Sequence, residues 1–236
     1  MIISHKYRFI FIKTSKTAST SIEIALSRFC GRDDIITRNS PDDEIIRQHL
    51  GYPGPQNHYL QFSEYSAKDW LNLLLRGKRK RLTSHLGASR IKQFVGNEIW
   101  NSYYKFCFER NPWDRTVSLY YHFLQDKKLN KMPGNESISA FIESGYPLRL
   151  KKRGIELYSI NNEIVVDRVC LFENLENELQ TVCNDILGMP EKISLPRAKG
   201  NHRKDLRHYR QILNPSDTET LKKIFSREID LFNYRF

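Results

Sequence analysis

Two short stretches of the sequence carry side chains suited to binding a phosphate group. Residues 13–21 read KTSKTASTS and hold two lysines among several hydroxyl residues. Residues 109–122 read ERNPWDRTVSLYYH and place Arg110 directly before an Asn-Pro pair. Ammonium, guanidinium and hydroxyl groups all donate hydrogen bonds to anionic oxygens, so both stretches are candidate anion sites.

The first stretch is expected to be the turn between a strand and a helix. The aromatic and β-branched run YRFIFIK, residues 7–13, predicts a buried strand, and residues 19–29 repeat apolar side chains at helical spacing. Helix N-termini carry unpaired N–H groups and a partial positive charge, so such a turn can bind phosphate.

This turn differs from the usual phosphate-binding loop because it contains no glycine. A Walker A loop reads GxxxxGK[ST], whereas this turn keeps only a Lys-Thr pair. We expect the backbone N–H groups of residues 17–20 to reach an anion with negative φ angles. The alternative is a lysine- and serine-rich helix cap, since Ser and Thr are good N-caps. The candidate ligands are Lys16, Thr17, Ala18, Ser19, Thr20 and Ser21.

The second stretch predicts another strand–turn–helix unit. The run YYKFCFE indicates a strand, and Asn111 and Pro112 stand where an N-cap and a first helical residue belong. Arg110 is then at the carboxyl end of a strand, where ligands bind in open α/β sheets. Ser118 lies two turns into the helix, and Arg115 is expected to form a structural ion pair.

The remaining elements place both units in an α/β fold. VVDRVCLF, residues 165–172, predicts a third strand, which a helix over ENLENELQTVCNDIL follows. Strands alternating with helices predict a P-loop-like three-layer sandwich with a central parallel β-sheet flanked by helices. Residues 31–65 are expected to be loop-rich. Further helices are expected at residues 66–76, from residue 88, at residues 137–144 and after Ser216 as a possible N-cap.

Length and composition indicate how many domains the chain forms and which classes of protein it does not resemble. A chain of 236 residues can bury one sizeable core, so residues 1–236 are expected to form a single domain. No run of about 18 apolar residues predicts a membrane span, and no membrane anchor is expected. The four cysteines show neither a CxxC pair nor zinc-like spacing, which favours reduced thiols in a cytoplasmic protein.

The net charge of +11 indicates an anionic partner. From charge alone, this partner can be nucleic acid, a nucleotide, an acidic glycan or a membrane surface. A nucleic-acid-binding protein should gather its basic residues on one face with stacking aromatics, whereas here the basic residues are dispersed. We therefore expect no nucleic-acid partner.

The two stretches together resemble the signatures of sulfotransferases that use 3′-phosphoadenosine 5′-phosphosulfate (PAPS). KTASTS after a strand resembles the 5′-phosphosulfate loop of the carbohydrate group that includes heparan sulfate 2-O-sulfotransferase and bacterial relatives. That loop often reads PKTAGTS or PKTASTS, so Ser15 replaces a proline here and Ser19 stands where glycine is frequent. ERNPWDRTVSLYYHF matches the second signature, R-[ND]-P-x-x-R-x-x-S-x-Y-Y, throughout. FENLENELQTVCNDIL and EIDLFNYRF are similar to late family segments.

The resemblance implies an activity and a set of roles. The reaction is transfer of a sulfuryl group from PAPS to an acceptor hydroxyl, for which a carbohydrate is expected and no metal is needed. Lys16 would stabilise the charge that develops on the leaving 5′-phosphate oxygen. Arg110 and Ser118 would bind the 3′-phosphate. Since no anchor is expected, the resemblance favours a bacterial cytoplasmic enzyme.

The acceptor hydroxyl needs a general base, and His85 is our candidate among the seven histidines. It ends LTSH, a strand-like segment that should bring it to the same sheet edge as Lys16 and Arg110. The alternative is a loop or capping histidine. His122, on the helix after Ser118, is expected to be structural.

Two loop regions complete the expected site. RAKGNHRKDLRHYR, residues 197–210, stands where the family has a basic loop that closes over PAPS, which makes Lys199 and Arg203 candidate phosphate ligands. A solvated basic loop is the alternative, and His202 and His208 could also contact nucleotide or acceptor. Residues 31–65 and 127–160 are the expected walls of the acceptor cleft.

Three rival function classes stay open at the level of sequence. A P-loop kinase or NTPase would use a similar turn, but it should show a glycine-bearing Walker A loop and an acidic magnesium ligand. The second rival is a basic nucleic-acid-binding protein, which the net charge suggests. The third is an inactive sulfotransferase fold that only binds nucleotide.

Overall fold

The computed structural model describes residues 1–126, 137–189, 192–196, 205 and 207–236. A five-stranded sheet with the order β3-β1-β2-β4-β7 forms its centre. The strands are β1 (Ile2–Ser4), β2 (Phe9–Ile12), β3 (Ile35–Ile36), β4 (Tyr104–Glu109) and β7 (Arg168–Leu171). A short hairpin, β5 (Ser159–Ile160) and β6 (Glu163–Ile164), precedes β7.

The sheet is only partly the parallel sheet expected from the sequence. β2, β4 and β7 pair in parallel, whereas β1 runs antiparallel to both of its neighbours. Only residues 5–8 separate β1 from β2, and Arg8 adopts a positive φ of 54° in that turn. A connection this short can join only antiparallel strands, because a parallel pair needs a long crossover. The prediction of a wholly parallel sheet is therefore wrong at this edge.

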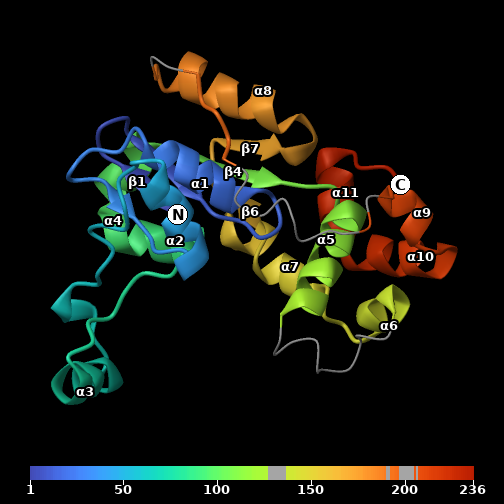
Figure 1. Ribbon diagram of the computed structural model, residues 1–236, viewed down its shortest axis with the longest axis horizontal. Coiled ribbons are helices and arrows are strands. Elements are labelled where there is room, and N and C mark those ends of the chain that lie inside the picture. Colours follow the sequence, from blue (N-terminus) through green and yellow to red (C-terminus); the bar gives the residue numbers. More distant parts are fainter. Residues whose placement is uncertain (127–136, 190–191, 197–204, 206) are drawn as a thin grey trace.

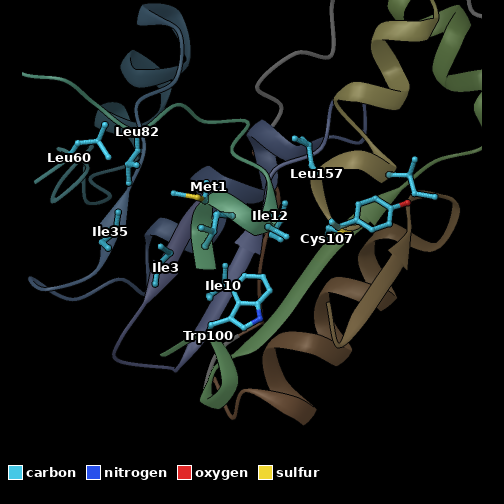
Figure 2. Close-up of a cluster of buried hydrophobic side chains, with 14 residues drawn as sticks. Met1, Ile3, Ile10, Ile12, Ile35, Leu60, Leu82, Trp100, Cys107 and Leu157 are labelled. Carbon is cyan, nitrogen blue, oxygen red and sulfur yellow. The ribbon is translucent and has the colours of Figure 1, made fainter. Parts of the chain in front are cut away.

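Helices cover both faces of the sheet, as the three-layer prediction requires (Figure 1). Phe9 and Phe11 of β2 pack in one cluster with α1 (Ser19–Ser27), α8 (Leu175–Gln180) and the π-helical turn Thr181–Ile186. Ile10 and Ile12 point to the opposite face, where α4 (Ala88–Ser102) packs. Figure 2 shows this second cluster, with Trp100 of α4 beside the strand side chains. The period-two alternation of β2 thus supplies both cores.

A block of helices lies beyond the carboxyl end of β4 (Figure 1). Its members are α5 (Pro112–Gln125), α6 (Ile138–Glu143), α7 (Leu148–Lys152), α9 (Tyr209–Ile212), α10 (Pro215–Ile224) and α11 (Ser226–Phe232). A third apolar cluster, which includes Trp113 and Phe141, holds them together. Among the described residues, none of the helices has the length and apolar character that a membrane crossing requires.

Of the two helix N-caps predicted from the sequence, the structure confirms Asn111 but not Ser216. Asn111 caps α5 through its side chain, as predicted. α10 begins one residue after Asn214, which forms a capping box with Asp217, so the predicted cap Ser216 lies inside the helix. Pro215 explains the difference, because a proline at the first helical position leaves the preceding residue as the cap.

Residues 31–65 contain more regular structure than expected. Besides β3, they include α2 (Pro41–His49), which Ser40 caps, and the single turn Phe62–Glu64. Beyond them, α3 (Ala67–Arg76) lies away from the rest of the molecule (Figure 1).

A buried ion-pair network joins α1, α2 and the residue that follows β2. Glu23 of α1 is fully buried and binds Lys13 at 2.8 Å and Arg47 of α2 at 3.2 Å. The amino group of Met1 lies 2.9 Å from the same carboxylate. Burial acts to raise the pKa of Glu23, but these positive charges outweigh it and hold the pKa at about 2. The network therefore fixes the start of the 13–21 turn against the helix that follows it.

Replacement of Glu23 by Gln is expected to destabilise the fold by about 3–5 kcal/mol, because it leaves Lys13 buried without a carboxylate and leaves buried Arg47 with only Glu44 as its partner. Denaturant unfolding at neutral pH measures this loss. Glu98→Gln, at an exposed position of α4, is the control and should unfold like the wild type.

The same pair of variants gives a pH test. Because the folded pKa of Glu23 is depressed, its stabilisation is complete above the ordinary value of 4.5 and is lost as the pH falls through about 2. The difference in unfolding free energy between the wild type and Glu23→Gln should therefore become smaller as the pH is lowered. Equal unfolding midpoints at neutral pH would contradict the assignment.

Candidate functional site

A cavity of about 820 Å³ lies where the carboxyl ends of β2, β4 and β7 meet the helix block. Its wall includes residues from 15–21, 118–126, 146–153 and 172–176, together with His85. β2 and β4 pair in parallel, so the turns that follow them open at the same edge of the sheet. Both stretches singled out in the sequence therefore border one cavity.

The backbone of the 13–21 turn differs from the expected one. Lys16 and Ala18 adopt positive φ angles of 65° and 54°, so the expectation of negative φ throughout is wrong. Thr17 between them does not share this conformation. In an anion-binding nest, left- and right-handed residues alternate and turn successive N–H groups toward one side. Two left-handed residues that flank Thr17 suit such a backbone. Each such non-glycine residue costs about 1–3 kcal/mol, a strain that is typical of functional loops.

Hydroxyl side chains hold this backbone in place. Thr14 donates to the carbonyl of Phe108 at 2.5 Å, and Ser19 donates to the carbonyl of Thr14 at 2.5 Å. Thr17 is fully buried, and its hydroxyl lies 2.9 Å from that of Thr14, so it supports the turn from behind the cavity wall. The residues of the turn that line the cavity are Ser15, Lys16, Ala18, Ser19, Thr20 and Ser21.

Arg110 links the two stretches directly. Its Nη1 donates to the carbonyl of Lys16 at 3.1 Å, and its Nε and Nη2 donate to Asp114 at 2.9 and 2.6 Å. The guanidinium lies 4.0 Å from the ring centroid of Phe172, which follows β7. These contacts orient the planar guanidinium at the cavity wall, which Ser118 also lines.

Arg115 has the structural role expected of it. The side chain is buried and forms an ion pair with buried Glu109, at the end of β4. Its Nε donates to the carbonyl of Ser15 at 2.8 Å, and its Nη2 donates to the carbonyl of Arg153 at 3.1 Å. A Cβ at Gly154 would lie 2.7 Å from the Arg115 guanidinium, so only glycine fits beside it. This clamp ties the 13–21 turn to α5 and to the end of α7.

His85 also lies on the cavity wall, although not at the end of a strand. Residues 82–86 form no strand. Arg81, just before them, makes an isolated antiparallel bridge with Tyr59, which the Leu82 N–H closes by donating to the carbonyl of His58 at 2.8 Å. The Nδ1 of His85 lies 2.7 Å from the carbonyl of Lys13. A carbonyl can only accept, so Nδ1 carries the proton and Nε2 remains the nitrogen that can take one up. Burial, with nearby positive charge, lowers the pKa of His85 to about 4.

Further residues of the cavity wall were not singled out in the sequence. Phe172, Tyr146, Arg149 and Arg153 line it, and so does His122, for which a structural role was expected. The position of Phe172 directly after a strand was a usable signal, since it implies the same sheet edge. LRLKKR, residues 148–153, was visible as a basic run, but no motif connects it to the other stretches.

The remaining residues named from the sequence are not among the described residues of the cavity wall. Lys199, Arg203 and His202 fall outside the described residues. His208 caps α9 and packs against the ring of Tyr209, and it is not part of the cavity lining. The four cysteines are free thiols, and within the described part of the chain no group of His, Cys, Asp and Glu is arranged to hold a metal ion.

Comparisons with known proteins identify one family. The model of the Sulfotransferase family matches residues 1–235, a range that contains both stretches and the whole cavity wall. A protein of Archaeoglobus fulgidus, described as an uncharacterized protein, is 31% identical over 135 residues, which is 50% of this chain and 98% of that relative. No solved structure matches the chain. The chain therefore belongs to the sulfotransferase family.

Proposed function

We propose that the protein transfers a sulfuryl group from PAPS to an acceptor hydroxyl, with a carbohydrate as the expected acceptor. The observation that carries this proposal is the contact of Arg110 with the carbonyl of Lys16. It holds the Arg110 guanidinium against the backbone of the 13–21 turn, and both Lys16 and Arg110 line the same cavity. A donor with one anionic group at its 5′ position and another at its 3′ position suits such a pair.

The cavity residues fit this donor. The nest-like backbone around Lys16 and Ala18 stands at the N-terminus of α1, where the helix dipole favours an anion. These groups would hold the 5′-phosphosulfate, while Arg110 and Ser118 would hold the 3′-phosphate. A volume of about 820 Å³ is within the range of nucleotide-sized sites.

Bound PAPS would supply an activated sulfuryl group on its 5′-phosphate. Lys16 would place its ammonium near the bridging oxygen and stabilise the charge that develops there. A nest-like turn would present its N–H groups toward one side, so little reorganisation would be needed at the moment of transfer. Catalysis would rest on positioning and electrostatics.

His85 would take the proton from the acceptor hydroxyl. The carbonyl of Lys13 holds its Nδ1–H, which leaves Nε2 as the proton acceptor. A neutral imidazole is required for this role, and the lowered pKa of His85 keeps it neutral at physiological pH. Anionic groups bound beside it would raise this pKa toward the working range and strengthen the base.

The acceptor side of the cavity supports a polar, hydroxyl-bearing substrate. Tyr146, Arg149 and Arg153 come from residues 127–160, one of the two regions expected to form the cleft. Residues 31–65, all of which are described, contribute no lining residue. The acceptor would therefore approach from the side of α7.

The first test is titration calorimetry with 3′,5′-adenosine bisphosphate, with 5′-AMP and ATP–magnesium as comparison ligands. The bisphosphate should bind most tightly, and Arg110→Ala should weaken its binding about tenfold or more while 5′-AMP changes little. Arg168→Ala is the matched control, because Arg168 also pairs with a helix carboxylate, that of Glu178, but lies outside the cavity lining.

Other outcomes of this titration would reassign the protein. Preference for ATP–magnesium would indicate a kinase-like activity. Absence of binding by all three ligands would favour an inactive or nucleic-acid-binding protein. If Arg110→Ala binds the bisphosphate as the wild type does, the 3′-phosphate assignment fails.

Lys16→Ala is expected to lower kcat by about 10²–10³, because it removes charge stabilisation that matters most in the transition state. Sulfate transfer to an acceptor found by screening glycans with PAPS measures it. Bisphosphate affinity should fall much less than kcat. Lys223→Ala, at an exposed position of α10, is the control. An equal loss in both quantities would make Lys16 a binding residue only.

His85→Ala should lower kcat by about 10²–10⁴, the usual contribution of a general base. The kcat/KM for the donor should stay flat as the pH falls from neutral through 6.5, because free His85 protonates only near a pKa of about 4. His122→Ala, on the same cavity wall, is the comparison and should keep most of the turnover. If His122→Ala is the inactive variant, the base has been misassigned.

A further inference from the structure

Residues 61–81 form an arm that stands apart from the proposed sulfotransfer site. The arm consists of the turn Phe62–Glu64, helix α3 and the basic run KRKR, residues 78–81. α3 lies away from the sheet and from the helix block (Figure 1). None of its residues lines the cavity described above.

One face of α3 is apolar and exposed. Trp70, Leu71, Leu74 and Leu75 are spaced one, three and four residues apart, which places them on the same side of a helix. Their exposed fractions are 41% for Trp70, 55% for Leu71, 79% for Leu74 and 73% for Leu75. Large apolar side chains grouped in this way mark a surface that a partner covers.

The arm is also strongly cationic. Its cations are Lys68, Arg76, Lys78, Arg79, Lys80 and Arg81. Its only two acidic residues are engaged in ion pairs, Asp69 with Lys80 at 2.7 Å and Glu64 with Arg90 of α4 at 2.9 Å. The arm therefore carries excess positive charge within a short distance of its leucines.

Aromatic contacts give the arm a defined shape. Phe62 stacks on Trp70 with 5.5 Å between ring centroids, and Tyr65 packs against Trp70 at 5.3 Å. The guanidinium of Arg79 lies 4.6 Å from the ring of Tyr59 and 5.2 Å from that of Phe62. These contacts fold the basic run back onto the base of the helix, so apolar and cationic groups are presented together.

We propose that the arm binds the surface of an anionic lipid bilayer. Leucines and a tryptophan on one helix face enter the boundary between headgroups and acyl chains, and the neighbouring lysines and arginines bind the anionic headgroups. Pairing of two copies of the chain through this face is disfavoured, because it would bring two positively charged arms together. A bilayer offers acyl chains to the apolar side chains of the arm and anionic headgroups to its lysines and arginines.

Flotation of the wild-type protein with lipid vesicles tests the proposal. Vesicles of phosphatidylglycerol and phosphatidylcholine in equal amounts should carry the protein with them, and vesicles of phosphatidylcholine alone should carry much less. Binding should weaken when the salt is raised from about 0.1 M to about 1 M, since salt screens the headgroup attraction.

Two matched pairs of variants locate the contact. Leu74→Ser should lower the affinity for anionic vesicles about tenfold, whereas Leu231→Ser, at a 48% exposed position of α11, should leave it unchanged. Lys78→Gln should lower it about fivefold, and Lys222→Gln, at an exposed position of α10, should not. The thermal unfolding midpoint and bisphosphate binding of all four variants should match the wild type, so a folding defect would be detected.

Three outcomes would overturn the proposal. The first is absence of flotation with anionic vesicles. The second is flotation that Leu74→Ser and Lys78→Gln do not weaken. The third is a wild-type dimer that fails to float and that Leu74→Ser converts to monomer, which would assign the face to a second copy of the chain. Failure of bisphosphate binding would overturn the sulfotransfer assignment and leave this one standing.

Discussion

The buried pair of Glu109 and Arg115 is the interaction on which the candidate site depends. The pair lies where β4 ends and α5 has just begun. The Arg115 guanidinium also donates to the carbonyls of Ser15 and Arg153. The second Glu109 oxygen accepts the hydroxyl of Tyr158 at 2.7 Å. One guanidinium thus connects three segments that are distant in sequence, and each of them carries part of the cavity wall. Its loss would leave Glu109 buried without a cation and would release both carbonyls at once.

The strands and helices that carry the site were predictable because their signals are local. β2, β4 and β7 are short, apolar runs, and Asn111 with Pro112 marks the start of α5 in the sequence itself. β1 and β3 were missed because strands of three and two residues leave no periodicity to detect. The cap of α2 was readable in a Ser-Pro pair, but the glycines and prolines that follow favoured a loop.

The chemistry of the site was less predictable than its location. Parallel neighbours place the ends of β2 and β4 together, so the meeting of Lys16 with Arg110 follows from topology. Arg149 and Arg153 reach the cavity through tertiary packing of α7, which no spacing in the sequence encodes. The left-handed backbone at Lys16 and Ala18 is likewise set by its neighbours, because propensity alone places glycine or asparagine there.

That glycine-free turn also changes what folding costs. An unfolded chain samples far fewer conformations at lysine, threonine and alanine than at glycine, so less conformational entropy is lost when the turn becomes ordered. This entropic advantage is opposed by the steric strain of the left-handed backbone at Lys16 and Ala18, which the surrounding hydrogen bonds hold in place. A loop built in this way therefore imposes a smaller entropic cost on anion binding than a glycine-rich loop would.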